Sequence, residues 1–171
     1  MQAEELRALQ APLKQRYREQ PQAAMITLSA RGNLDEGIAC SVETGKALVQ
    51  AGLHPATGGD GLAVCSGDML LQALVACAGV TLRAVATALG VPVHGGTVMA
   101  EGDLDFRGTL GVSREAPVGF ADIRLCFDLE TDATPAQLEQ VLTLTERYCV
   151  VYQTLRSAPP VSLTLRKASE Q

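Results

Sequence analysis

The sequence is poor in aromatic residues and in the residue patterns of metal or nucleic-acid sites. It has no tryptophan, three phenylalanines and three tyrosines, so Leu, Val and Ala must build most of the core. Its two histidines, His54 and His94, have no partner at a usual ligand spacing, so we expect no metal. A net charge of −5 without a basic block argues against nucleic acid as the main partner. No other cofactor is predicted.

The chain also lacks the patterns typical of secretion or of membrane insertion. Its first 20 residues are charged and helix-like, unlike a basic region followed by an apolar run. The longest apolar stretch, residues 69–89, is rich in alanine and contains Arg83. A membrane span would normally carry more Leu and Ile and no central arginine, so this stretch predicts a buried helix of a soluble protein. We therefore expect a cytoplasmic protein with no membrane partner.

Five cysteines are present, none of them in a C-x-x-C pair. An odd number without a secretory signal does not suggest a disulfide framework. Cys126 lies on the polar side of an alternating segment and is predicted to be exposed. Cys40 alternates with apolar residues and is predicted to be a small core residue, whereas Cys65 precedes a helix and is predicted to be partly exposed. The remaining two are Cys77 and Cys149.

The length of 171 residues predicts one domain, and hydrophobic periodicity predicts an α+β fold with antiparallel sheets packed on helices. Gly32-Asn33 is interpreted as a hairpin turn, Ser66 as the cap of the long helix and Thr134 as the cap of a later helix. Gly-Pro-rich residues 51–61 predict a loop. Helices are expected at 4–18, 67–89 and 135–156, and strands at 24–31, 37–43, 97–107, 120–130 and 161–166.

Cys77 and Cys149 each lie on a predicted helix, among small or apolar residues. Both face the same interior if the two helices pack together. Because the helix dipole acts only within the first turn, it cannot activate a thiol as deep in its helix as Cys77. A reactive thiolate there needs a cation from elsewhere in the fold. On spacing alone, two buried structural cysteines remain the alternative.

Two segments resemble the signatures of the OsmC/Ohr family. Residues 66–83 (SGDMLLQALVACAGVTLR) are similar to its first signature, in which a helix of small residues carries Ala-Cys before Thr. Residues 146–155 (ERYCVVYQTL) are similar to the second, a Cys-Pro-Val segment followed by Thr-Leu. The similarity spans about residues 24–166. It divides the chain into an N-terminal amphipathic helix, residues 1–22, and an OsmC-like domain, residues 23–171.

The resemblance implies an intertwined homodimer in which antiparallel sheets wrap two central helices. It also implies a thiol peroxidase of organic hydroperoxides, with hydrogen peroxide left open as a second substrate. Cys77 would be the peroxidatic cysteine, and Cys149 the resolving one. A small dithiol or a lipoylated protein would then reduce the disulfide, without metal or flavin.

In the hydroperoxide-resistance branch, an arginine from the first hairpin and a glutamate at the helix entry hold the thiolate. Arg31 matches that arginine, and a solvated turn residue is its alternative. Gly67 takes the place of the glutamate, with Asp68 next to it, and Val150 takes the place of the proline. These departures place the chain nearer the OsmC-like branch. They leave open a ligand-binding or redox-sensing dimer that kept the cysteine pair without efficient turnover.

Overall fold

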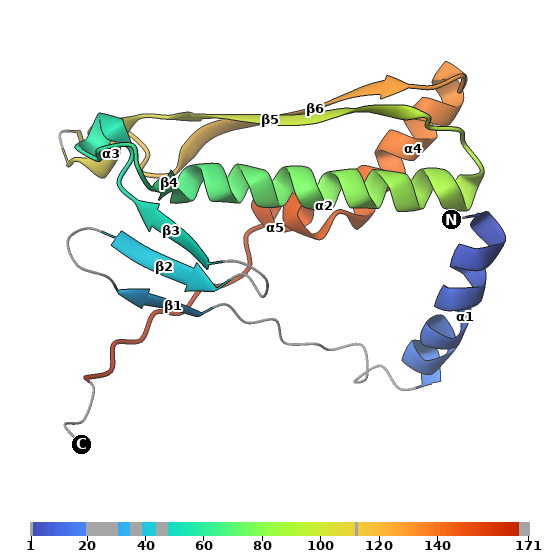
Figure 1. Ribbon diagram of the computed structural model, residues 1–171, viewed down its shortest axis with the longest axis horizontal. Helices are drawn as coiled ribbons and strands as arrows, with labels where there is room; N and C mark the ends of the chain where they lie inside the picture. The colour runs from blue at the N-terminus through green and yellow to red at the C-terminus, as the bar shows by residue number, and fades with distance from the viewer. Residues whose placement is uncertain (1, 20–30, 35–38, 44–47, 112, 168–171) are drawn as a thin grey trace.

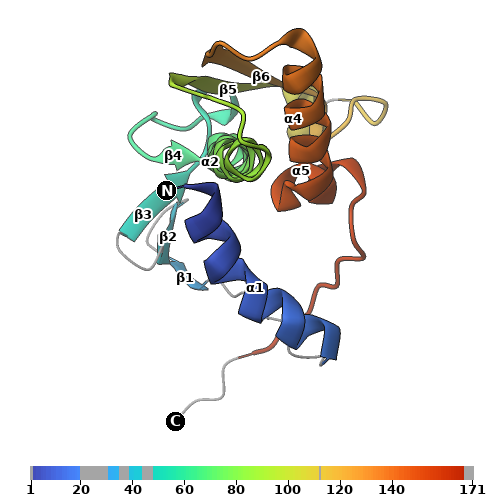
Figure 2. The same ribbon diagram turned by 90° about the vertical axis from the view of Figure 1, so that its right-hand side faces the viewer.

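The computed structural model describes residues 2–19, 31–34, 39–43, 48–111 and 113–167. One long helix, α2, runs through the centre of a mixed α and β arrangement (Figures 1 and 2). A hairpin of two long strands covers one side of α2, two successive helices cover another, and a four-stranded sheet lies toward its N-terminal end. The elements are α1 (Ala3–Glu19), β1 (Arg31–Leu34), β2 (Ala39–Glu43), β3 (Leu48–Gly52), η2 (Pro55–Thr57), β4 (Val64–Cys65), α2 (Ser66–Leu89), β5 (Gly95–Leu104), α3 (Phe106–Thr109), β6 (Phe120–Glu130), α4 (Pro135–Tyr148) and α5 (Val150–Arg156).

The central helix α2 confirms the helix predicted over residues 67–89. It buries one face, formed by residues spaced four apart, which is the spacing that aligns side chains on a helix. The helix is capped by Gly90, whose φ of +69° is in the left-handed region that favours glycine. The Gly90 N–H donates to carbonyls in the last turn of the helix. Ser66 is not the cap, because pairing of β4 with β3 carries the chain straight into the helix and puts Cys65 at the N-cap. The buried residues are Leu74, Ala78, Leu82 and Ala86.

The hairpin of β5 and β6 is antiparallel and alternates between an inner and an outer face, as predicted. On β6, Ile123, Leu125, Phe127 and Leu129 are half-buried, and the residues between them are exposed. Strict alternation along β6 would place Ala121 on the inner face with these residues, but Ala121 is exposed. The register shifts between Asp103 and Leu104, so that Ala121 falls in a bulge and Phe120 turns inward instead.

The four-stranded sheet has the order β1-β2-β3-β4, with β3 and β4 parallel and the other pairs antiparallel. The predicted turn at Gly32-Asn33 is wrong, because these residues lie within β1 opposite Val42 and Ser41. Cross-strand pairing overrides the local turn preference of this dipeptide. Residues 24–30 of the first predicted strand lie outside the described residues. Strand β3 was not predicted, and its last two residues belong to the segment interpreted as a loop.

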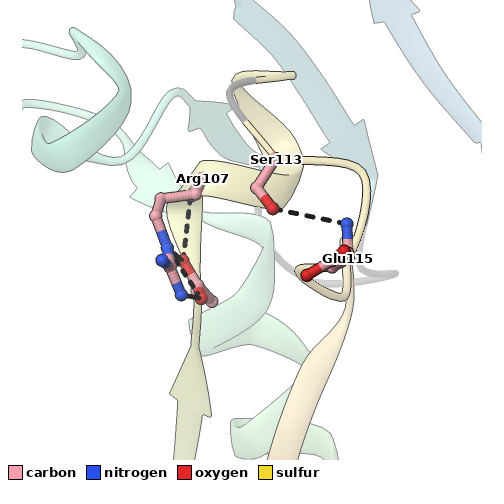
Figure 3. A network of polar contacts seen from close by, with 4 residues as sticks. Arg107, Ser113 and Glu115 are labelled. Atoms are coloured by element: carbon pink, nitrogen blue, oxygen red, sulfur yellow. Dashed lines mark hydrogen bonds and ion pairs between the residues drawn. The ribbon is translucent and has the colours of Figure 1, made fainter.

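The strand predicted to reach residue 107 ends at Leu104, because Asp105 caps the short helix α3. The Asp105 carboxylate accepts from the backbone N–H of Arg107 at 3.1 Å and binds the Arg107 guanidinium. Figure 3 shows this arrangement beside the turn in which the Ser113 hydroxyl accepts from the Glu115 N–H at 3.3 Å. Local side-chain bonds therefore convert the end of the predicted strand into a turn of helix.

The C-terminal region differs from prediction in two places. The Thr134 capping box with Gln137 is present, but the predicted helix 135–156 divides at Cys149 into α4 and α5. On α4, Leu142 is exposed, whereas Val141, Thr145 and Cys149 are buried. Residues 161–166 form no strand in the described chain. Their apolar side chains are open to solvent, with Leu163 99% exposed, and none of the described strands pairs with this segment.

Candidate functional site

The break between α4 and α5 is the first feature of the site. Cys149 has extended backbone angles, φ −72° and ψ 109°, and serves both as the end of α4 and as the N-cap of α5. Its N–H still bonds to Thr145 O at 2.9 Å, and its carbonyl accepts from Gln153 N at 3.0 Å. The first N–H groups of a helix have no partner within it, so those of α5 are free to bind other acceptors. The break thus creates a cluster of donors in the middle of what looked like one helix.

These donors meet the thiol of Cys77, which lies on the neighbouring helix α2. Burial raises the pKa of Cys77, but hydrogen bonds from the Val151 N–H, the Cys149 thiol and the Val150 N–H outweigh it. The net pKa of Cys77 therefore lies below the ordinary value for cysteine. The Thr81 hydroxyl has the smallest effect of the groups that lower the pKa of Cys77. Its proton is donated to the backbone carbonyl of Cys77 at 2.8 Å. The arrangement stabilises a thiolate at Cys77.

Cys149 has the opposite character. Its side chain is buried, with 1% of its surface exposed. Burial raises the pKa of Cys149, the Tyr152 N–H partly offsets this, and the neighbouring Cys77 raises it further, so the net pKa lies above the ordinary value. The pKa values of the two neighbouring thiols are therefore displaced in opposite directions. Cys77 favours the charged form, and Cys149 favours the protonated form that can donate to it.

The sequence predicted that groups outside α2 must stabilise a thiolate at Cys77. The structure agrees with that prediction, but the stabilising groups are not the predicted cation. No charged side chain is among the groups that lower the pKa of Cys77 in the described structure. Neutral backbone N–H groups of Val150 and Val151 take that role. Sequence reasoning missed them because the stripe of residues 138–149 predicted an unbroken helix. The signal available was the departure from helical periodicity at Val150-Val151, two β-branched residues directly after Cys149.

Arg31, the predicted activating cation, is placed only by its backbone. It begins β1, opposite Glu43 of β2, at the outer edge of the four-stranded sheet. Its side chain lies outside the described part of the structure. Figure 1 shows β1 on the side of the sheet away from α2, so strands β2, β3 and β4 separate it from the helix that carries Cys77 in the same protomer. The role of Arg31 stays a prediction.

The other cysteines lie apart from this pair as far as the structure describes them. Cys126 is exposed on the outer face of β6, opposite Met99, as predicted. Cys65 is half-buried at the N-cap of α2, where its sulfur lies near Gly67. A Cβ on Gly67 would lie 3.4 Å from Phe120 and 3.6 Å from Cys65 and Leu104, so the side chains of these three residues line the place where a side chain at position 67 would begin. Cys40 pairs with Leu34 and Ala51 in the sheet, and its side chain is not described.

A cavity of about 580 Å³ lies between α2, β6, α4 and α5 and reaches the pair from the side of Cys149. Its walls are mainly apolar, and Glu146, Tyr152 and Arg156 provide polar groups. Cys77 does not line it. On the side of Cys77 the structure instead exposes apolar residues, with Val80 72% and Val150 70% exposed. Within the described residues, no cluster of three His, Cys, Asp or Glu side chains could hold a metal ion.

Comparisons with known proteins show the family and the fold of the chain. The family model for OsmC-like proteins matches residues 58–164. An OsmC-like protein from Mycoplasma pneumoniae is similar in structure, with a TM-score of 0.66, 14% identity, and coverage of 78% of this chain and 89% of that one. A Legionella pneumophila structure, described as an organic hydroperoxide resistance protein OsmC and predicted redox protein, has a TM-score of 0.61 and 17% identity over 78% of this chain and 92% of that one. No curated protein sequence matches the chain.

An organic hydroperoxide resistance protein from Elizabethkingia anophelis is also similar, with a TM-score of 0.62 and 12% identity over 79% of this chain and 91% of that one. Because the family model matches more than half of the chain, the chain belongs to the family of OsmC-like proteins. The structures confirm the OsmC fold. Among the described residues, only α2 is long and apolar enough to cross a membrane, and this helix packs against α4, α5 and β5.

Proposed function

We propose that this chain is a thiol peroxidase that reduces organic hydroperoxides through Cys77 and Cys149. The observation that carries the proposal is the contact between two thiols whose pKa values are displaced in opposite directions. A thiolate is the nucleophile in peroxide reduction, and a nearby protonated thiol is suited to resolve the product. Family membership and neighbours named for hydroperoxide resistance support the same function.

The reaction follows from this pair in three steps. The Cys77 thiolate attacks one peroxide oxygen, the O–O bond breaks, and the alkoxide takes a proton and leaves as an alcohol, so that Cys77 becomes a sulfenic acid. The sulfur of Cys149 then attacks Cys77, water leaves, and a disulfide forms. A dithiol or lipoylated-protein reductant restores both thiols and is itself oxidised to a disulfide. No metal or flavin takes part in these steps.

The apolar surroundings of Cys77 suit an organic substrate. Val80 lies one turn further along α2 and Val150 follows Cys149, and both expose most of their side chains. Such surfaces bind the alkyl part of an organic hydroperoxide better than they bind hydrogen peroxide. Hydrogen peroxide is the poorer substrate in this proposal.

The proposal includes a homodimer in the cytoplasm, where thiols are kept reduced. Two features of the single chain support a partner copy. Within one protomer, only 22% of the most apolar 18-residue stretch of α2 is buried. Alternating Val161, Leu163 and Leu165 are almost fully exposed although they follow the pattern of a strand. A second copy would cover both features.

The test is the consumption of cumene hydroperoxide by the purified protein with dithiothreitol or dihydrolipoamide as the electron donor. Rapid turnover in the parent and none in Cys77→Ser would support the proposal. Catalytic turnover that survives in Cys77→Ser would contradict it.

Gly67 favours a second candidate, a ligand-binding or redox-sensing dimer. In the hydroperoxide-resistance branch an acid at this position orients the activating arginine, and here the neighbouring Asp68 is exposed. A sensor would form the Cys77–Cys149 disulfide with one equivalent of peroxide but would turn over slowly with every dithiol. Multiple turnovers per minute with dihydrolipoamide would exclude this candidate.

A further inference from the structure

The break between α4 and α5 leaves backbone groups that an unbroken helix would pair with each other. In an unbroken helix the Val150 N–H would donate to the carbonyl of Glu146, four residues earlier. In the structure that carbonyl accepts instead from the side-chain amide of Gln153, Nε2, at 2.7 Å. The side chain of Gln153 thereby takes the place of a backbone donor. The Val150 N–H is left to donate to the thiol of Cys77.

The carboxylate of Glu146 holds α5 from a second direction. Its Oε1 accepts from the Tyr152 hydroxyl at 3.2 Å and also binds the guanidinium of Arg156. Three side chains on α5 therefore reach back across the break to one residue in the last turn of α4. Gln153 and Tyr152 are half-buried, so solvent competes less for their bonds than for the exposed Arg156.

We propose that Gln153 and Glu146 are positioning residues, which hold the α4–α5 break open so that the N–H groups of Val150 and Val151 face the thiol of Cys77. The proposal rests on the proposed function, because it concerns how Cys77 becomes the nucleophile.

The physical reason is a competition for the carbonyl of Glu146. A buried carbonyl that loses its donor costs about 1–3 kcal/mol, so it will recruit another donor. Without the Gln153 amide, the donor that regular helix geometry would supply is the Val150 N–H. Its return to the Glu146 carbonyl would close the helix and withdraw a hydrogen bond from Cys77. The carboxylate clamp opposes that closure, because it fixes α5 through Tyr152 and Arg156.

The test uses variants that remove these bonds one at a time. Gln153→Met keeps the length of the side chain but has no amide, and Glu146→Ala removes the carboxylate. Glu146→Gln is the conservative variant, because it keeps Oε1 as an acceptor for Tyr152. Gln140→Met, at an exposed position of α4, is the matched control.

Two quantities are measured for each variant, with the whole chain in its reduced form. The first is the pH dependence of Cys77 alkylation by iodoacetamide, measured by peptide mass. The second is the rate of Cys77 oxidation by one equivalent of cumene hydroperoxide. Gln153→Met and Glu146→Ala are expected to move the alkylation profile to higher pH and to slow oxidation about three- to tenfold at neutral pH, which corresponds to the loss of one hydrogen bond. Glu146→Gln and Gln140→Met should match the parent.

Several outcomes overturn the proposal. If Gln153→Met and Glu146→Ala retain the parent profile, the two residues do not position the donors, even if unfolding in urea shows a loss of stability. A shift of the Glu146→Ala profile to lower pH would also overturn it, because that sign indicates only the removal of a negative charge. If Gln153→Met fails to fold, Tyr152→Phe is the variant that tests the proposal. A shift of its Cys77 alkylation profile to higher pH supports the proposal, and an unchanged profile overturns it.

The proposed function fails separately from this inference. It fails if the parent consumes no cumene hydroperoxide with any dithiol, whatever the profiles of the variants. A parent that reacts rapidly while all the variants behave alike leaves the proposed function intact and removes the role of Gln153 and Glu146.

Discussion

The thiol of Cys77, in the middle of α2, lies close enough to the thiol of Cys149, at the break between α4 and α5, that each cysteine shifts the pKa of the other. Seventy-one residues separate them in the sequence, so their proximity depends on the packing of α2 against α4 and α5. Their pKa values are displaced in opposite directions, which gives the two cysteines different chemical roles.

The first prediction concerns those roles. Cys149→Ser should allow one turnover with cumene hydroperoxide and then leave Cys77 open to further oxidation, because no thiol remains to capture the sulfenic acid. Mass spectrometry after excess peroxide should find a sulfinic or sulfonic acid at Cys77. Cys126→Ser is the control and should behave like the parent. Recovery of full multiple turnover in Cys149→Ser would show that another thiol resolves Cys77.

The second prediction is a pH dependence. Only the thiolate reacts with iodoacetamide, so the rate rises with pH as each thiol loses its proton. Since the pKa of Cys77 is lowered and that of Cys149 is raised, the alkylation of Cys77 should reach its plateau at a lower pH than that of Cys149. The midpoint of each profile on the pH axis reports the pKa of the thiol. Burial of the thiol lowers only the plateau rate of alkylation. Coincident profiles, or a reversed order, would remove the assignment of Cys77 as the nucleophile.

The third prediction concerns Arg31. Arg31→Ala should raise the pKa of Cys77 and slow its oxidation by cumene hydroperoxide several-fold, while the fold stays intact. A cation near a thiolate favours the charged form. Arg31→Lys keeps the positive charge, so its rate of Cys77 oxidation should fall less than that of Arg31→Ala. The measurement is the single-turnover rate together with the circular dichroism spectrum. An unchanged rate in Arg31→Ala would mean that the N–H groups of Val150 and Val151 are sufficient without this arginine.

The fourth prediction is the oligomeric state. Light scattering at micromolar concentration should give about 36 kDa, twice the 18.0 kDa of one chain. Val80→Glu should weaken the dimer, because a carboxylate buried in an apolar interface costs several kcal/mol. Val118→Glu, at an equally exposed valine outside the helices, should leave the mass unchanged. A mass near 18 kDa for the parent would contradict the prediction.

The fifth prediction concerns the substrate. Val150→Ser should slow the reduction of cumene hydroperoxide more than that of hydrogen peroxide, because it removes apolar surface beside Cys77 without removing the backbone N–H. An effect of about three- to fivefold on the ratio of the two rates corresponds to the burial of one methyl group. The hydrogen peroxide rate serves as the internal control. If both rates fall equally, Val150 does not contact the organic part of the substrate.

Local signals in the sequence were sufficient to predict several of the elements. The four-residue spacing of apolar residues in α2, its Gly90 stop, the capping box of Thr134 and the alternation of β5 and β6 depend on short-range periodicity and side-chain bonds. The two signatures around Cys77 and Cys149 also identified the family and the residues to compare. Local signals misled where distant pairing competes with them, as at Gly32-Asn33, which β2 holds within a strand.

The surroundings of the two cysteines depend on tertiary packing. Residues 138–156 contain no proline, and the β-branched Val150 and Val151 lower helix propensity only slightly, so the sequence does not require a break at Cys149. The break is stable because Gln153 and Glu146 satisfy the groups that it frees, and because Cys77 accepts from the donors that it exposes. The thiolate at Cys77 is thus held by backbone N–H groups, which every residue but proline carries, and their direction is set only when α5 packs against α2.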